Sequence, residues 1–252
     1  MCTLIILYKV TEGYPILVAA NRDERYGRRS APPGILKTDP LVWGGRDLEA
    51  GGTWLGFNQK GLLVGITNRS TPNPPDPSRR SRGLLCLEAL SRSTASEVRT
   101  FLEQERGGRY NPFNLFYADP WEAYISSYQD GVCTVSLLPG RYVLTNQGNV
   151  NDLSLQRTRT ILERLQELPG SDVTLILDTL KTLCRWHGDP VGPRTSPVCV
   201  HGDGYGTVSS SIIALGSGKY RKMYLHAEGK PCLVPYHDHA SMLGGPLPPV
   251  PF

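Results

Sequence analysis

The amino-acid sequence predicts an α+β fold in which mostly antiparallel sheets are covered by helices. Many short apolar runs are joined by hairpin-like turns, and the 252 residues include 27 glycines and 21 prolines, which favour turns and short strands over long helices. A smaller group of helical patterns lies in the middle of the chain. This arrangement of elements is typical of the α+β class.

The strand pattern begins almost at the amino terminus. An apolar run at residues 4–8 is followed by another at residues 15–20, and the turn residues between them predict a hairpin. A strand–turn–strand unit is predicted over residues 51–58 and 62–68. Further strands are predicted at residues 113–117, 123–128, 132–137, 142–145, 198–201, 207–215, 219–226 and 232–234.

Four segments carry the signals of helices. Residues 84–90 are a short apolar run, and residues 94–97 are a capping-box pattern that opens a helix through residue 105. Apolar residues recur at helical spacing over residues 155–168 and again over 173–183. Residues 69–82 are rich in proline and arginine, which predicts an irregular surface loop.

Composition limits the classes of function. A net charge of +4 is too small to argue for nucleic-acid binding. The six cysteines contain no Cys-x-x-Cys pair, which favours reduced thiols over a disulfide framework or a zinc site. No apolar run reaches the ~20 residues that span a bilayer, and the amino end lacks the pattern of a signal peptide. We therefore expect a cytoplasmic protein with one domain over residues 1–240 and a flexible tail over 241–252.

Cys2 is the first candidate for catalysis. Initiator methionine is usually removed when the next side chain is small, and Cys2 then carries a thiol and a free α-amine on one carbon. The α-amine has an ordinary pKa of about 7.7–8, so it can take the thiol proton near neutral pH. While Met1 remains attached, the nitrogen of Cys2 is an amide and cannot act as a base. The structural alternative is a small buried side chain at the start of a strand.

Polar residues occur where several predicted strands end. They are residues 21–24, Asn68, Asn146 and residues 209–211. Each is an ordinary turn former or satisfied polar residue when taken alone. A thiolate that attacks an amide needs a cation, an acid that orients its amine, and a donor for the oxyanion. Arg22, Asp23 and an asparagine side chain offer these three groups.

A set of motifs then identifies a resemblance. These motifs are Met1 and Cys2, Ala-Asn-Arg-Asp-Glu at 20–24, Gly-Gly-Thr-Trp-Leu-Gly at 51–56, Thr-Asn at 67–68, Tyr-Asn-Pro-Phe-Asn-Leu at 110–115, Leu-Thr-Asn at 144–146 and Tyr-Gly-Thr at 205–207. Their order and context resemble the NRDE family, also called the transport and Golgi organisation family, over residues 1 to about 225. That family is similar in outline to N-terminal-nucleophile hydrolases of the penicillin V acylase and bile salt hydrolase type. The resemblance implies a four-layer αββα sandwich.

The resemblance also implies roles for particular residues. By analogy, Cys2 is the nucleophile, Arg22 and Asp23 are its partners, and Asn146 donates to the oxyanion. Asn68 is a second donor or a substrate contact, and the further substrate-binding candidates are Asn21, Glu24, Arg79 and Ser209. The chain departs from the family at Val208, where members often carry arginine after Tyr-Gly-Thr.

Three hypotheses for function remain open. The first is an amidohydrolase that cleaves a linear amide, such as an acylated amine or amino acid, through a Cys2 acyl-enzyme and without a cofactor. The second is a non-catalytic carrier of haem or of a lipid or acyl-CoA-type ligand, because eukaryotic relatives are linked to haem trafficking and lipid handling. The third is a structural or partner-binding protein. No nucleic acid or integral membrane segment is expected, and the sequence leaves the oligomeric state open.

Two further groups carry weaker signals. His237, Asp238 and His239 have the side chains of metal ligands, but they lie beside the predicted tail without a third ligand cluster, so a solvated loop is favoured and no metal is expected. Arg79, Arg80 and Arg82 on the proline-rich loop are expected to be solvated or to meet an anionic group of a substrate.

Overall fold

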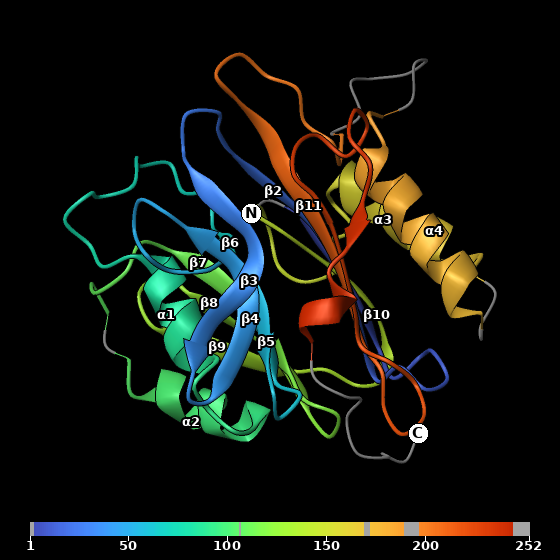
Figure 1. The fold of residues 1–252 in the computed structure, drawn as a ribbon. Helices are drawn as coiled ribbons and strands as arrows, with labels where there is room; N and C mark the ends of the chain where they lie inside the picture. Colours follow the sequence, from blue (N-terminus) through green and yellow to red (C-terminus); the bar gives the residue numbers. More distant parts are fainter. Residues whose placement is uncertain (1–2, 106, 169–171, 189–196, 244–252) are drawn as a thin grey trace. The chain divides into compact units, whose positions relative to one another are not determined.

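The computed structural model describes residues 3–105, 107–168, 172–188 and 197–243, and these residues form two compact units. The first unit contains the described residues up to Arg28 and from Pro139 onward, and the second contains residues 29–138. Within the described ranges, each unit has one antiparallel sheet and two α-helices (Figure 1). The predicted α+β class is therefore confirmed.

The sheet of the first unit has six strands in the order β10-β1-β2-β11-β12-β13. Their bounds are β1 Thr3–Tyr8, β2 Ile16–Arg25, β10 Gly140–Thr145, β11 Tyr205–Leu215, β12 Met223–Ala227 and β13 His237–Asp238. The predicted amino-terminal hairpin is confirmed as β1 and β2, which are paired from Thr3 with Asn21 to Tyr8 with Ile16. Both strands are interior to the sheet, which explains why β1 and the first half of β2 are almost continuously apolar.

Two helices pack on this sheet. Helix α3 spans Gln156–Gln166 and helix α4 spans Val173–Arg185. Their apolar stripes, including Ile161 of α3 and Leu180 of α4, share one buried cluster with the strand residues Ile5 and Leu17. Asp172 caps the start of α4, because its carboxylate accepts the N–H of Thr174 at 2.8 Å.

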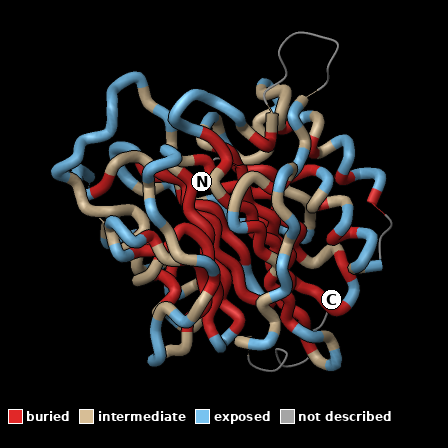
Figure 2. Tube along the Cα trace, turned by 45° about the horizontal axis from the view of Figure 1, so that its top comes forward, coloured by how far each residue is buried: buried red, intermediate tan, exposed pale blue. Residues whose placement is uncertain are grey.

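The sheet of the second unit has seven strands that follow one another in sequence order from β3 to β9. Their bounds are β3 Ser30–Thr38, β4 Leu41–Asp47, β5 Leu55–Asn58, β6 Leu63–Asn68, β7 Phe113–Ala118, β8 Ala123–Tyr128 and β9 Val132–Ser136. Helix α1 spans Arg82–Ala89, and helix α2 spans Ala95–Glu103 behind its Thr94 cap. In both units the buried residues are concentrated in the strands (Figure 2).

Several elements differ from the sequence-based prediction. Strands β3 and β4 are not among the predicted strands. Strand β3 contains Pro32 and Pro33, which it accommodates because it is an edge strand, where a missing N–H costs no ladder bond. The strand expected at 198–201 is reduced to a bridge between His201 and Gly206, and residues 232–234 form a turn.

The end of the described chain is a short 3-10 helix, η1, at Ala240–Met242. The expected tail over 241–252 thus begins inside this helix, and its residues 244–252 lie outside the described residues. Among the described residues, the structure contains no helix that is both long enough and apolar enough to cross a membrane.

Candidate active site

Strand β2 brings the predicted polar residues to one end of the sheet of the first unit. Thr3, the first described residue of β1, is paired with Asn21 on one side and with Thr145 on the other. Arg22 and Asp23 continue β2 beyond that pair, and Asn146 follows Thr145 at the end of β10. The beginning of β1 therefore lies beside three of the predicted catalytic residues. Cys2 itself lies outside the described residues.

A cavity of about 420 Å³ opens at this end of the sheet, and Asp23 and Asn146 both line it. The other residues of its wall are Thr145, Gln147, Ser154, Leu155, Gln156, Arg157, Val200 and Tyr205. Most of these side chains are polar, and all belong to the first unit. Arg157, in the first turn of α3, donates from Nη1 to the Thr3 hydroxyl at 3.1 Å. The cavity thus adjoins the beginning of β1.

Asp23 is fixed by a network that starts in β11. Its side chain is buried, and its Oδ1 accepts the hydroxyl proton of Thr207 at 2.6 Å. The Thr207 hydroxyl also accepts the N–H of Val200 at 2.9 Å, and the Tyr205 hydroxyl donates to the Asp23 carbonyl at 3.3 Å. Such hydrogen bonds hold a carboxylate in one orientation.

Strand β11 contains a β-bulge directly beside this network. Thr207 is paired with Asp23 and Ser209 with Arg22, so Val208 is the extra residue between them. A bulge re-aims the side chains around it and is common next to active sites. Val208, the residue that departs from the motif of the resembled family, is therefore the bulge residue itself.

The other candidates of the first unit have different surroundings. Asn21 is buried, and its side-chain NH₂ donates to the carbonyls of Cys184 at 2.8 Å and Val198 at 2.9 Å, so it joins the end of α4 to the segment before β11. Glu24 is half-buried and lies 3.8 Å from the guanidinium of Arg28. Ser209 is buried, and its Oγ has no hydrogen-bond partner among the described residues.

Asn68 and Arg79 belong to the second unit. Asn68 ends β6, where it is paired with Phe113 of β7. Arg79 donates from Nη1 to the Tyr110 carbonyl at 2.9 Å, and its Nε lies 3.5 Å from Asp76. Arg79 also lines a separate cavity of about 240 Å³ beneath the proline-rich loop. Its guanidinium therefore meets groups of the chain itself.

Sequence analysis missed several residues of the site. Thr207 and Tyr205 were noted only as part of a family motif, although both hold Asp23. Arg157 lies within the predicted helix and is not among the predicted site residues; an arginine in a first helical turn, where the dipole disfavours cations, was the available signal.

Replacing Thr207 with valine is expected to lower the free energy of unfolding by about 2 kcal/mol, because the buried Asp23 carboxylate loses a hydroxyl donor that valine cannot replace. Urea unfolding at pH 7 measures the change. Thr207→Ser, which keeps the hydroxyl, is expected to lose much less. Equal losses in the two variants would mean that the methyl group matters and the hydrogen bond does not.

Comparison with solved structures defines the class of fold. The chain is similar to penicillin V acylase from Agrobacterium tumefaciens (TM-score 0.56, 14% identity, 90% of this chain and 83% of that one). It is also similar to the N-acylethanolamine-hydrolyzing acid amidase orthologue of Caenorhabditis elegans (TM-score 0.59, 15% identity, 84% and 92%). A mutant of conjugated bile acid hydrolase from Clostridium perfringens matches as well (TM-score 0.57, 12% identity, 100% and 99%). The predicted αββα fold of N-terminal-nucleophile hydrolases is confirmed.

Sequence comparison identifies the family. The family model described as "Transport and Golgi organisation 2" matches residues 1–225. The human transport and Golgi organization protein 2 homolog is 31% identical over 231 residues, which cover 79% of this chain and 82% of that protein. The chain belongs to the transport and Golgi organisation 2 family.

Proposed function

We propose that this protein is an amidohydrolase that cleaves a linear amide through an acyl-enzyme on Cys2. The observation that carries the proposal is the position of Thr3, which follows Cys2 in the chain and is paired with both Asn21 and Thr145 beside the cavity. The similar structures are those of a penicillin V acylase, an N-acylethanolamine-hydrolyzing acid amidase and a conjugated bile acid hydrolase, and these names support hydrolysis as the class of reaction. Because fold alone does not fix activity, the proposal rests on the site.

In the proposed reaction, the α-amine of Cys2, exposed by loss of Met1, takes the thiol proton. The thiolate then attacks the carbonyl carbon of the amide, and the Asn146 side chain with a backbone N–H stabilises the oxyanion. The C–N bond breaks, the leaving nitrogen takes the proton from the ammonium, and a thioester on Cys2 remains. Water, deprotonated by the same amine, hydrolyses the thioester and releases the acid.

Asp23 and Arg22 have supporting roles in this scheme. The Asp23 carboxylate, held by Thr207, orients the α-ammonium while it carries the proton. Arg22 is buried in β2 next to Asp23, and its charge favours the thiolate form of Cys2. We assign Asn21, Glu24 and Ser209 no direct part in the chemistry.

The wall of the cavity favours a substrate with a polar or anionic group near the scissile amide. Arg157 supplies a cation, and Gln147, Ser154 and Gln156 supply hydrogen-bonding groups. An acylated amino acid has the matching chemistry. The wall offers little apolar surface to a haem or a long acyl chain, which favours hydrolysis over the carrier hypothesis.

The state of the amino terminus tests the proposal. Intact mass of the purified protein is expected to lack Met1, and an electrophilic amide or β-lactone probe is expected to add one acyl group at Cys2. A Cys133→Ser variant serves as the control, because Cys133 is an exposed thiol of the second unit. A mature protein that keeps Met1 would refute the mechanism.

The carrier hypothesis makes a different prediction. A carrier binds haem with a shift of the Soret band, or binds acyl-CoA with measurable heat, whether or not Met1 is present. The amidohydrolase hypothesis expects neither signal at micromolar protein. We also propose a cytoplasmic location, since the five described cysteines are free thiols and thiols persist in reducing compartments.

A further inference from the structure

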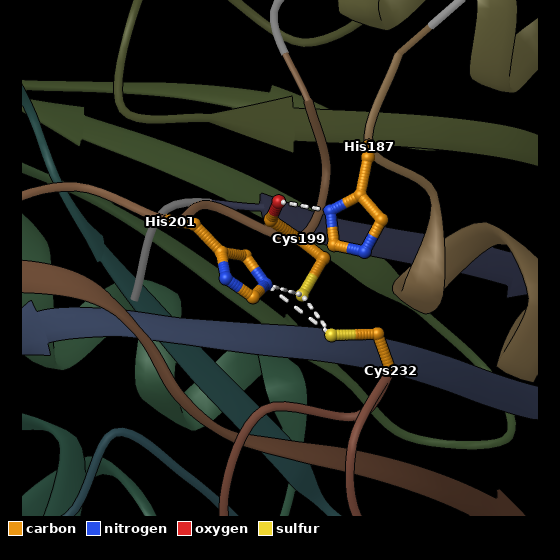
Figure 3. A group of neighbouring side chains, drawn as sticks. All are labelled: His187, Cys199, His201 and Cys232. Atoms are coloured by element: carbon orange, nitrogen blue, oxygen red, sulfur yellow. Dashed lines mark hydrogen bonds between the residues drawn. The ribbon is translucent and has the colours of Figure 1, made fainter.

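Four metal-binding side chains converge in the first unit, and none of the four is part of the wall of the cavity. They are His187, Cys199, His201 and Cys232, and one donor atom from each lies within 4.8 Å of all the others (Figure 3). The four residues come from three separate segments: the residues after α4, the residues before β11, and the turn after β12. Sequence spacing did not predict this group, because only Cys199 and His201 are neighbours in the chain.

The distances fit a tetrahedral zinc ion. The two sulfur atoms lie 3.6 Å apart, and Nε2 of His201 lies 3.6 Å from the Cys199 sulfur and 3.2 Å from the Cys232 sulfur. Zn–S bonds of about 2.3 Å and Zn–N bonds of about 2.0 Å at tetrahedral angles place two sulfurs about 3.8 Å apart and sulfur and nitrogen about 3.5 Å apart. A disulfide instead requires about 2.05 Å between the sulfurs.

His187 has the correct tautomer to be the fourth ligand. Its Nδ1 lies 3.2 Å from the carbonyl oxygen of Cys199, and a carbonyl only accepts, so Nδ1 carries the proton. The lone pair is then on Nε2. Metal-binding histidines commonly donate their other N–H to a backbone carbonyl in this way. The three distances among the donor atoms of the other ligands are 3.6, 3.6 and 3.2 Å, so the longest separation, up to 4.8 Å, involves His187. It exceeds the tetrahedral spacing of about 3.5 Å by about 1.3 Å, and a movement of His187 of that size closes the site.

Hydrogen bonds from backbone and side-chain groups hold the three segments together without the help of a metal. The N–H groups of Val198 and Cys199 both donate to the Trp186 carbonyl, at 3.0 and 2.9 Å. The Arg185 guanidinium donates to the Pro231 carbonyl at 3.0 Å, which ties the Cys232 turn to the end of α4. The ligands are therefore presented by a preformed frame.

The geometry points to a structural zinc site formed by His187, Cys199, His201 and Cys232. Zinc replaces the thiol protons of the two cysteines, which leave to solvent, and the two neutral imidazoles coordinate through Nε2. Two thiolates and two imidazoles fill all four positions of a tetrahedral ion, so no position stays open for a substrate or an activated water.

The zinc site is connected to the candidate active site through Val200. Val200 lies between the ligands Cys199 and His201, and its N–H and C=O both bond Thr207, at 2.9 Å each. Thr207 in turn donates to Asp23. Fixing the ligands therefore fixes one wall of the cavity. The zinc assignment does not depend on the proposed hydrolase activity.

Metal analysis of the purified full-length chain tests the inference. Protein dialysed against metal-free buffer is expected to keep one zinc ion per chain, measured by inductively coupled plasma mass spectrometry. Replacement by cobalt is expected to give the intense ligand-field bands of a tetrahedral site and a thiolate charge-transfer band. A strong chelator is expected to lower the Tm, and zinc is expected to restore it.

Single substitutions identify the ligands. Cys199→Ser, His201→Gln, Cys232→Ser and His187→Gln are each expected to lose bound zinc and the cobalt bands, whereas the control Cys133→Ser keeps both. Where a variant fails to fold, thiol counting on the native chain replaces it: zinc protects the two thiols from modification, and chelation exposes them. A chain without zinc, or one whose mass shows Cys199 and Cys232 joined in a disulfide, would overturn the assignment.

Discussion

Replacing Cys2 with alanine is expected to abolish acylation by the probe and to lower amide turnover by at least about 10³-fold, because alanine keeps the α-amine but removes the nucleophile. Turnover of an acylated amino acid, measured as release of the free amine, gives the change. The folded structure is expected to survive, since alanine is a small residue at the end of a chain.

Two further variants separate the thiol from the amine. Cys2→Ser also permits loss of Met1 and keeps a hydroxyl nucleophile, so it is expected to retain weak activity. An amino-terminal extension that cannot be removed keeps the thiol but blocks the amine, and it is expected to be as inactive as Cys2→Ala. Full activity in the extended chain would show that the amine is not the base.

Lowering the pH from 7 to 4 is expected to reduce the free energy of unfolding by about 3 kcal/mol through His226 alone. His226 of β12 is buried, and its Nδ1 lies 2.9 Å from the Ser211 hydroxyl. Burial, with a smaller contribution from His239, lowers the pKa of His226 to about 4. In the unfolded chain His226 takes up a proton near pH 6.5, whereas in the folded chain it is protonated only near pH 4. The contribution of His226 to the free energy of unfolding is therefore fully present above pH 6.5 and is lost as the pH falls from 6.5 to 4.

Urea unfolding of the His226→Gln variant isolates this contribution. Glutamine keeps a hydrogen-bonding group for Ser211 but does not titrate, so the loss of stability between pH 7 and pH 4 is expected to shrink by the same amount. His237→Gln, at an exposed histidine of the neighbouring β13, is the matched control and is expected to leave the loss unchanged. A pH dependence that persists in His226→Gln would contradict the assignment.

Local sequence patterns were sufficient to predict those helices and strands whose structure depends mainly on their own residues. The hairpin of β1 and β2 and the stripes of α3 and α4 were predicted because each buries a continuous apolar face. Strand β3 was missed because its prolines are tolerated only at a sheet edge, and a sequence does not reveal where the edge lies. The segment at 198–201 has strand composition but bonds to Trp186 and Thr207 instead of forming a ladder.

The candidate site was predictable to the extent that its residues lie next to one another or in a family motif. Asp23 and Asn146 were selected from strand ends and the resemblance, and both line the cavity. Asn21 was selected for the same reason, but its amide joins two backbone carbonyls. The group of metal-binding residues could not be predicted from the sequence. His187 follows α4 and Cys232 lies in the turn after β12, and only the tertiary fold brings them next to Cys199.

The division of the chain between the two sheets has a consequence for synthesis on the ribosome. Strands β1 and β2 emerge first, yet their sheet neighbours β10 and β11 begin at residues 140 and 205. For most of translation the amino-terminal hairpin has two apolar edges without partners, which invite aggregation. Residues 29–138 contain all seven described strands of the other sheet, so the partners of those strands are complete before β10 is made. The end of the sheet that carries Asp23 is therefore completed only when β11 has been made, because Asp23 is paired with Thr207 of that strand.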